Sequence, residues 1–164
     1  MKNRGVVDKA NLDTLDNDII RLLTENGRMP IGEMSKRLKV TAPTIRNRIK
    51  DLEKSGIFKV SGLIDPNQHP QMITALVAMS IQSHGKMDQI LEKIAGLPNV
   101  VWAGVSTGRY DIIAEVVCVE GKDELYRFTT KTILKIGNVV RSETFIMMKS
   151  RQNWLCLPDG VEKI

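Results

Sequence analysis

The chain has 164 residues, of which 42% are hydrophobic and 26% charged, as in an ordinary globular protein. This length fits one large domain or two small ones. No apolar stretch approaches the roughly 20 residues of a membrane helix, and the polar start, Met1 to Gly5, lacks the apolar core of a signal peptide. We therefore expect a cytoplasmic protein.

Chemistry-bearing residues are sparse. The two cysteines, Cys118 and Cys156, and the two histidines, His69 and His84, do not cluster at metal-ligand spacing. The expectation is a reduced core thiol at Cys118, no metal, no cofactor and no catalytic residues.

The net charge of +5 is concentrated in the first third of the chain. Residues 1–60 carry 13 Lys and Arg against 8 Asp and Glu, whereas residues 61–164 carry 11 of each. Between Lys36 and Lys50 there are six basic residues and no acidic one. DNA-binding surfaces have this composition because cations displace the counterions of phosphates. A solvated basic face without a partner has it too, so charge alone leaves both interpretations open.

The first predicted helix begins at Asp13, a good N-cap with Asp16 three residues later. Apolar residues then recur at helical spacing from Leu15 to Leu23. Gly27 is expected to end this helix in a left-handed conformation.

The second predicted helix opens at Pro30, and Lys39 and Val40 turn the chain. Thr41 is the expected N-cap of a third helix that ends at Gly56. Its predicted buried residues are Ile45, Ile49 and Leu52. Residues 57–60 are expected to form a short strand.

Two short helices joined by a tight turn, the second one basic, indicate a helix-turn-helix. Arg46 and Asn47 are placed to contact guanine and adenine edges, and Lys50 suits a phosphate. Arg48 has two open roles, packing beside the buried stripe or contacting a phosphate. The predicted DNA-binding residues are Lys36, Arg37, Thr41, Ala42, Thr44, Arg46, Asn47 and Lys50.

The composition of the chain also predicts its domain boundaries. Residues 63–71 contain two prolines and turn formers, which indicates a linker between a first domain over 1–62 and a second over 72–150. Residues 151–164 form an unassigned tail.

The second domain alternates strands and helices. Strands are predicted over 73–81, 100–106, 111–119 and 139–149, with helices near 87–94 and 122–135, the latter with Leu125, Phe128 and Thr132 inward. Asn99-Val100-Val101 recurs 39 residues later as Asn138-Val139-Val140, so two strand-helix-strand units follow each other. We expect a βαββαβ ferredoxin-like sandwich and an α+β protein. Its uncovered apolar sheet face predicts a dimer or larger assembly.

The loop Gly108-Arg109-Tyr110-Asp111 joins the two repeats. Gly108 permits close backbone approach, Arg109 suits a carboxylate, and Asp111 suits an ammonium group. This pairing fits an amino acid ligand. An ordinary hairpin whose aspartate caps its own turn has the same sequence, and the residues alone favour that interpretation.

From Leu12 to Lys149 the chain resembles the Lrp/AsnC family of regulators. The resemblance rests on segments in the expected order, of which the most specific are Thr41-Ala42-Pro43-Thr44-Ile45-Arg46-Asn47-Arg48-Ile49, Leu63-Ile64-Asp65-Pro66 and Gly108-Arg109-Tyr110-Asp111. It departs after Asp65-Pro66, where the family usually has a glycine and this chain has Asn67 to Gln71.

The resemblance implies a winged-helix-like DNA-binding domain on double-stranded DNA. It also implies a βαββαβ domain that forms homodimers and often octamers, with an amino acid effector held near Gly108, Arg109, Tyr110 and Asp111. The expected function is a sequence-specific transcriptional regulator that is modulated by a small molecule. Two alternatives remain open: a decarboxylase of the haem pathway on the same scaffold, and a co-regulator whose first domain binds protein.

Overall fold

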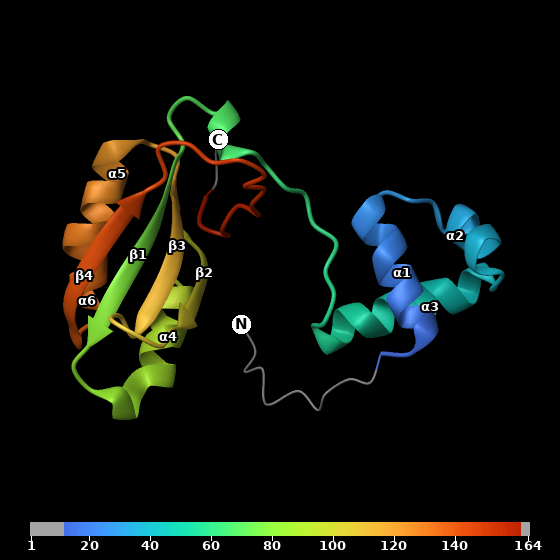
Figure 1. The fold of residues 1–164 in the computed structure, drawn as a ribbon, viewed down its shortest axis with the longest axis horizontal. Coiled ribbons are helices and arrows are strands. Elements are labelled where there is room, and N and C mark those ends of the chain that lie inside the picture. The colour runs from blue at the N-terminus through green and yellow to red at the C-terminus, as the bar shows by residue number, and fades with distance from the viewer. Residues whose placement is uncertain (1–11, 162–164) are drawn as a thin grey trace. The chain divides into compact units, whose positions relative to one another are not determined.

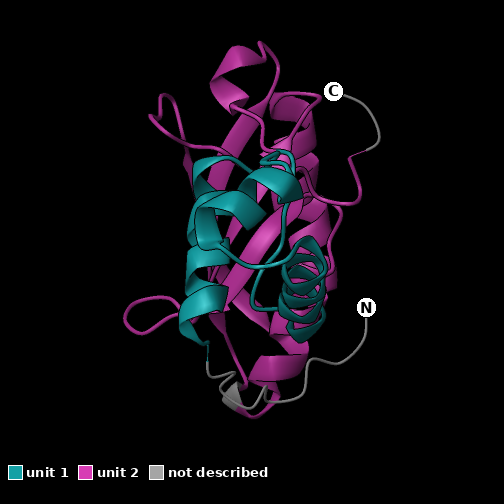
Figure 2. Cartoon of the chain, turned by 90° about the vertical axis from the view of Figure 1, so that its right-hand side faces the viewer, with its two compact units in different colours: residues 1–62 teal, residues 63–164 magenta. Residues whose placement is uncertain are grey.

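The computed structural model describes residues 12–161 and divides the chain into two compact units, residues 1–62 and residues 63–164 (Figure 1, Figure 2). Each unit has its own hydrophobic core. No helix in the described range is long and apolar enough to cross a membrane.

The first unit consists of three helices, α1 (Thr14–Glu25), α2 (Ile31–Leu38) and α3 (Ala42–Ser55). The capping box is confirmed, since Asp13 Oδ1 accepts a hydrogen bond from the Asp16 backbone N–H at 2.8 Å. Thr41 caps α3, and Gly56 ends it in a left-handed conformation at φ 73°. The helices enclose three fully buried side chains: Ile19, Met34 and Ile45.

Two local predictions in this unit are wrong. The first helix ends at Asn26 in an extended conformation, not at a left-handed Gly27. The left-handed residue of this region is instead Lys39 (φ 56°), where the chain turns between α2 and α3. Residues 57–60 form no strand. A strand needs a partner for its backbone groups, and residues 12–62 otherwise fold as helices and turns; Phe58 packs against the helical core instead.

The second unit has a four-stranded sheet with the order β2-β3-β1-β4, in which all neighbours are antiparallel. This arrangement confirms the ferredoxin-like βαββαβ sandwich and the α+β class. The elements are η1 (Pro66–Gln68), β1 (Ile73–Ile81), η2 (His84–Lys86), α4 (Met87–Ala95), β2 (Val100–Val105), β3 (Ile112–Cys118), α5 (Lys122–Arg127), η3 (Phe128–Thr132), α6 (Ile133–Lys135) and β4 (Val139–Ile146).

The last helix differs from its prediction in register. The segment η3 is a π turn, in which the N–H of Ile133 donates to the carbonyl of Phe128 five residues earlier. A π turn holds one more residue than an α turn, so the next inward position moves along the chain. Leu125 and Phe128 are buried as predicted, but Ile133 is fully buried and Thr132 only half-buried.

The two sheet faces have different surroundings. Paired residues on neighbouring strands face the same side of a sheet. One row across the sheet contains Val77 and Ala114, which belong to the core beneath the helices. The adjacent row lies on the opposite face, and its side chains are Trp102, Glu115, Leu76 and Phe145. Trp102 and Phe145 are 46% and 45% exposed. We call this second surface the open sheet face.

Residues 63–71 and the tail both belong to the second unit. Ile64 and Leu155 form an antiparallel bridge with N···O distances of 3.0 and 3.1 Å, and Leu155 is 3% exposed. Further along the tail, Gly160 lies so close to Pro98 that an added Cβ would come within 2.1 Å of the Pro98 Cβ. The tail is therefore docked at two points.

The two cysteines have different environments. Cys118 is fully buried on β3, and burial raises the pKa of its thiol to about 12. Cys156, in the tail, is half-buried.

Candidate functional sites

The exposed side of α3 carries polar and cationic groups. Arg46, Asn47 and Lys50 are exposed, whereas Ile45 and Leu52 on the opposite side are buried. At the helix start the hydroxyl of Thr41 accepts a hydrogen bond from the Thr44 backbone N–H, and the two threonine hydroxyls lie 2.8 Å apart. Thr41 thus acts mainly as a cap, with Thr44 and the half-buried Ala42 beside it.

Most cations of this region are available for a ligand. Within residues 12–161, Lys36, Arg46 and Lys50 make no ion pair, whereas Arg37 pairs with Glu33 at 2.5 Å, one helical turn earlier on α2. An exposed pair of this kind is weak, so it leaves the Arg37 guanidinium able to exchange partners.

The structure settles the position of Arg48. Its Nη1 lies 2.7 Å from Asp13 Oδ2 and 3.1 Å from Asp16 Oδ1, so it joins α3 to the start of α1. The Asp16 backbone N–H, and then the Arg48 guanidinium, hold the pKa of Asp13 below its usual value. Arg48 therefore orients α3 within the unit. The sequence alone does not reveal this role, because even the nearer partner along the chain, Asp16, is 32 residues away.

The loop after β2 is held from several sides. Gly108 has φ 122°, a conformation that favours glycine, and among residues 12–161 no atom beyond its two chain neighbours lies within 4 Å of where its Cβ would be. The positive φ gives Gly108 a conformational role in this loop. The Arg109 guanidinium lies 5.6 Å from the centre of the Tyr110 ring, and the Tyr110 hydroxyl donates to Glu143 on β4.

Asp111 fastens this loop to β1. Its Oδ2 accepts the Ile81 backbone N–H at 2.8 Å, and its own N–H donates to the Met79 carbonyl at 2.9 Å. The carboxylate thus caps the end of a neighbouring strand. The structure brings Tyr110 and Glu143 together. The sequence offers no signal for Glu143, which reaches the loop only through the β1–β4 pairing.

Both units match models of known protein families. Residues 12–59 match the model for a winged helix-turn-helix DNA-binding domain, and residues 74–153 match the model for the Lrp/AsnC ligand-binding domain. The HTH-type transcriptional regulator PH0140 of Pyrococcus horikoshii is 36% identical over 140 residues, which cover 85% of this chain and 87% of that protein. The chain belongs to the Lrp/AsnC family.

Solved structures agree with this assignment. The structure of AsnC from E. coli has 26% identity and a TM-score of 0.69 over 85% of this chain and 93% of that one. The regulator NMB0573 of Neisseria meningitidis, solved as a complex with L-Met, shares the fold at 23% identity and a TM-score of 0.69, over 85% and 91%. This Lrp/AsnC protein is a DNA-binding transcriptional regulator with a ligand-binding domain.

Proposed function

We propose that this regulator recognises its operator through the exposed side of α3, as a homodimer assembled through the open sheet face. The observation that carries the proposal is the division of α3 into a buried apolar side and an exposed side whose Arg46 and Lys50 make no ion pair within residues 12–161. Thr44, Arg46 and Asn47 then contact base edges. Lys36, Arg37 and Lys50 contact phosphates, with Thr41 and Ala42 at the helix start.

The open sheet face is the proposed dimer interface. Monomeric proteins seldom leave such an apolar surface in water, and aromatic residues such as Trp102 and Phe145 are enriched at interfaces. Glu115 accepts the Trp102 indole N–H at 2.7 Å, which pairs one of the polar groups that an interface would bury. Dimerisation would place two copies of α3 on one operator, as helix-turn-helix proteins require for paired half-sites.

Phe145→Lys tests this interface. We expect the dimer to dissociate at least about tenfold more readily, because an unpaired ammonium group would be buried in place of an aromatic anchor. Sedimentation velocity over a concentration series measures the change. Leu134→Lys is the matched control, since Leu134 is an exposed apolar residue of α6, among the helices of the other face. Equal effects of the two substitutions would exclude the open sheet face as the interface.

The proposed effector is an amino acid bound at the Gly108–Asp111 loop. Arg109 is exposed and offers a guanidinium to a carboxylate. Glu143 accepts the Tyr110 hydroxyl, Asp111 follows Tyr110 in the chain, and the two carboxylates supply acidic groups for an ammonium. The relatives are regulators, which favours this function over the decarboxylase alternative.

The experiment that tests the regulator proposal is a titration of DNA from upstream of the gene, at two salt concentrations, with and without amino acids that include L-Met. We expect specific binding that weakens steeply with salt, because phosphate contacts release counterions. We also expect an amino acid to shift the binding curve in wild type but not in Arg109→Gln, with Lys135→Gln as the control. Absence of a preferred sequence, even in a random DNA pool, would contradict DNA recognition. If the amino acid still shifted the DNA-binding curve of Arg109→Gln, the loop would be excluded as the effector site, while the DNA-recognition proposal would stand.

A further inference from the structure

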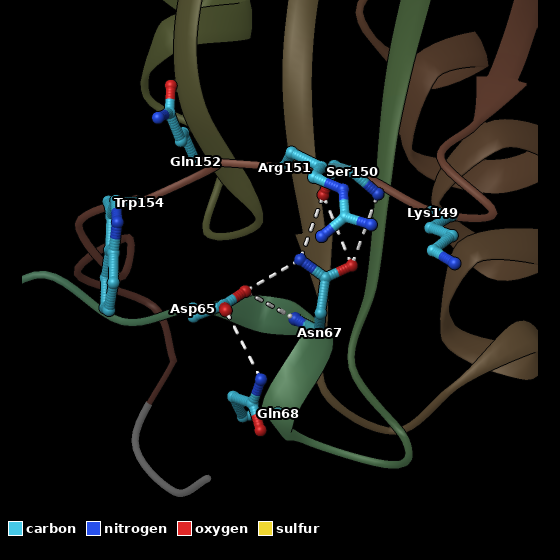
Figure 3. Close-up of a pocket in the computed structure, with 8 residues that line it drawn as sticks. All are labelled: Asp65, Asn67, Gln68, Lys149, Ser150, Arg151, Gln152 and Trp154. Atoms are coloured by element: carbon cyan, nitrogen blue, oxygen red, sulfur yellow. Dashed lines mark hydrogen bonds between the residues drawn. The ribbon is translucent and has the colours of Figure 1, made fainter.

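A pocket lies outside the loop just described. It has a volume of about 460 Å³ and forms between the segment that follows residue 63 and the start of the tail (Figure 3). Its volume falls within the range of small-molecule sites, roughly 300–1,000 Å³. Asp65 and Asn67 lie on one wall; Lys149, Ser150, Arg151 and Trp154 lie on the other.

The two walls come from distant parts of the chain and are joined directly. Asn67 Nδ2 donates to Ser150 Oγ at 3.0 Å across 83 residues of sequence. The Ile64–Leu155 bridge holds the same two segments together. The pocket therefore exists in full only while the tail is docked.

The charges around the pocket favour an anion. Lys149 and Arg151 are exposed, and neither forms an ion pair with any residue between 12 and 161. The single acidic group is already engaged, because Asp65 Oδ1 accepts the Asn67 backbone N–H at 3.0 Å and Asn67 Nδ2 at 2.7 Å. These hydrogen bonds lower the pKa of Asp65, so the carboxylate is ionised at neutral pH and directed toward η1.

Trp154 adds an aromatic surface at the same pocket. Its side chain is 60% exposed, whereas tryptophan is on average a highly buried residue. The indole stands on one side of the pocket, and Arg151 extends over Asn67 in the middle (Figure 3). An exposed indole that lines the same pocket as a guanidinium provides a stacking surface in addition to an anion-binding group.

We propose that this pocket binds a small phosphate ester that carries a planar ring, of the nucleoside monophosphate class. The Arg151 fork and the Lys149 ammonium hold the phosphate, and the ring stacks on Trp154. A ligand that touches both walls stabilises the docked tail, because it binds the closed arrangement and not the separated segments. This site goes beyond the DNA and amino acid functions proposed above and does not depend on them.

The test uses the full chain with Trp102→Phe, which leaves Trp154 as the only tryptophan. AMP, adenosine and inorganic phosphate are titrated while the Trp154 fluorescence is followed. We expect AMP to quench this fluorescence with the lowest Kd of the three ligands. Arg151→Gln should weaken AMP binding at least about tenfold, because the variant loses a charged hydrogen bond to the phosphate. Lys135→Gln, on α6 and outside the pocket, is the matched control.

Amide hydrogen exchange gives an independent readout. The N–H groups of Ile64 and Leu155 donate to each other's carbonyls, so saturating AMP is expected to slow the exchange of both. No quenching at millimolar AMP, or equal affinity in the Arg151→Gln protein, would overturn the site. Phosphate or adenosine alone binding as tightly as AMP would overturn the assigned ligand class.

Discussion

Ile45→Ala is expected to unfold the first unit and to leave the second unit folded. Ile45 is fully buried between α1 and α2 with Ile19 and Met34, and an Ile-to-Ala change in a core costs about 2–5 kcal/mol. A domain has only about 0.05–0.15 kcal/mol of stability per residue, so this loss consumes most of what a unit of this size has. Because the second unit has a separate core, its sheet should survive.

Calorimetry and amide NMR spectra distinguish unfolding of the first unit alone from unfolding of both units. The variant should lose the signals of α1 to α3 at room temperature, keep those of the sheet, and fail to bind DNA. Ile57→Ala is the matched control, because it removes the same atoms from a side chain that is 40% exposed. Simultaneous loss of both units in the Ile45 variant would show that the two units do not fold independently.

Arg46→Ala is expected to weaken binding to the preferred operator by about 1–3 kcal/mol and to relax the preference at one base position. Arg46 projects from the exposed side of α3 without an ion-pair partner among residues 12–161. A guanidinium that contacts guanine through two hydrogen bonds distinguishes that base, whereas a phosphate contact does not.

Binding to a library of operator variants measures this effect. Lys36→Ala serves as the comparison, because the loss of a phosphate contact should weaken all sequences uniformly and reduce the salt slope by about one. Arg21→Ala, on an exposed side of α1, should change neither quantity. An unchanged sequence preference in the Arg46 variant would refute its base-contacting role.

Local chemistry made much of this fold predictable. Asp13, Thr41 and Gly56 mark helix ends through groups within a few residues, and the structure confirms all three. The predicted strand from Ile73 to Ile81 has both ends correct, since this mainly apolar run lies between turn formers.

The errors have tertiary causes. Residues 57–60 have the composition of a strand, but residues 12–62 contain no strand to pair with them. The inward residue of the last helix moved from Thr132 to Ile133 because a π turn changes the helical period, which no periodicity argument anticipates. By contrast, helical periodicity alone was enough to predict which residues of α3 face the solvent as candidate DNA-binding residues. The Tyr110–Glu143 contact and the Asn67–Ser150 contact depend on strand order and tail docking.

The two cysteines make the native chain selectively labelable. A maleimide reacts with thiolate, and a buried thiol with a pKa near 12 supplies almost none at neutral pH. Cys156 is more accessible and lies next to Leu155, the residue that docks the tail. A dye attached there without any substitution would sit on the tail, and its mobility would report directly whether that segment is docked or released.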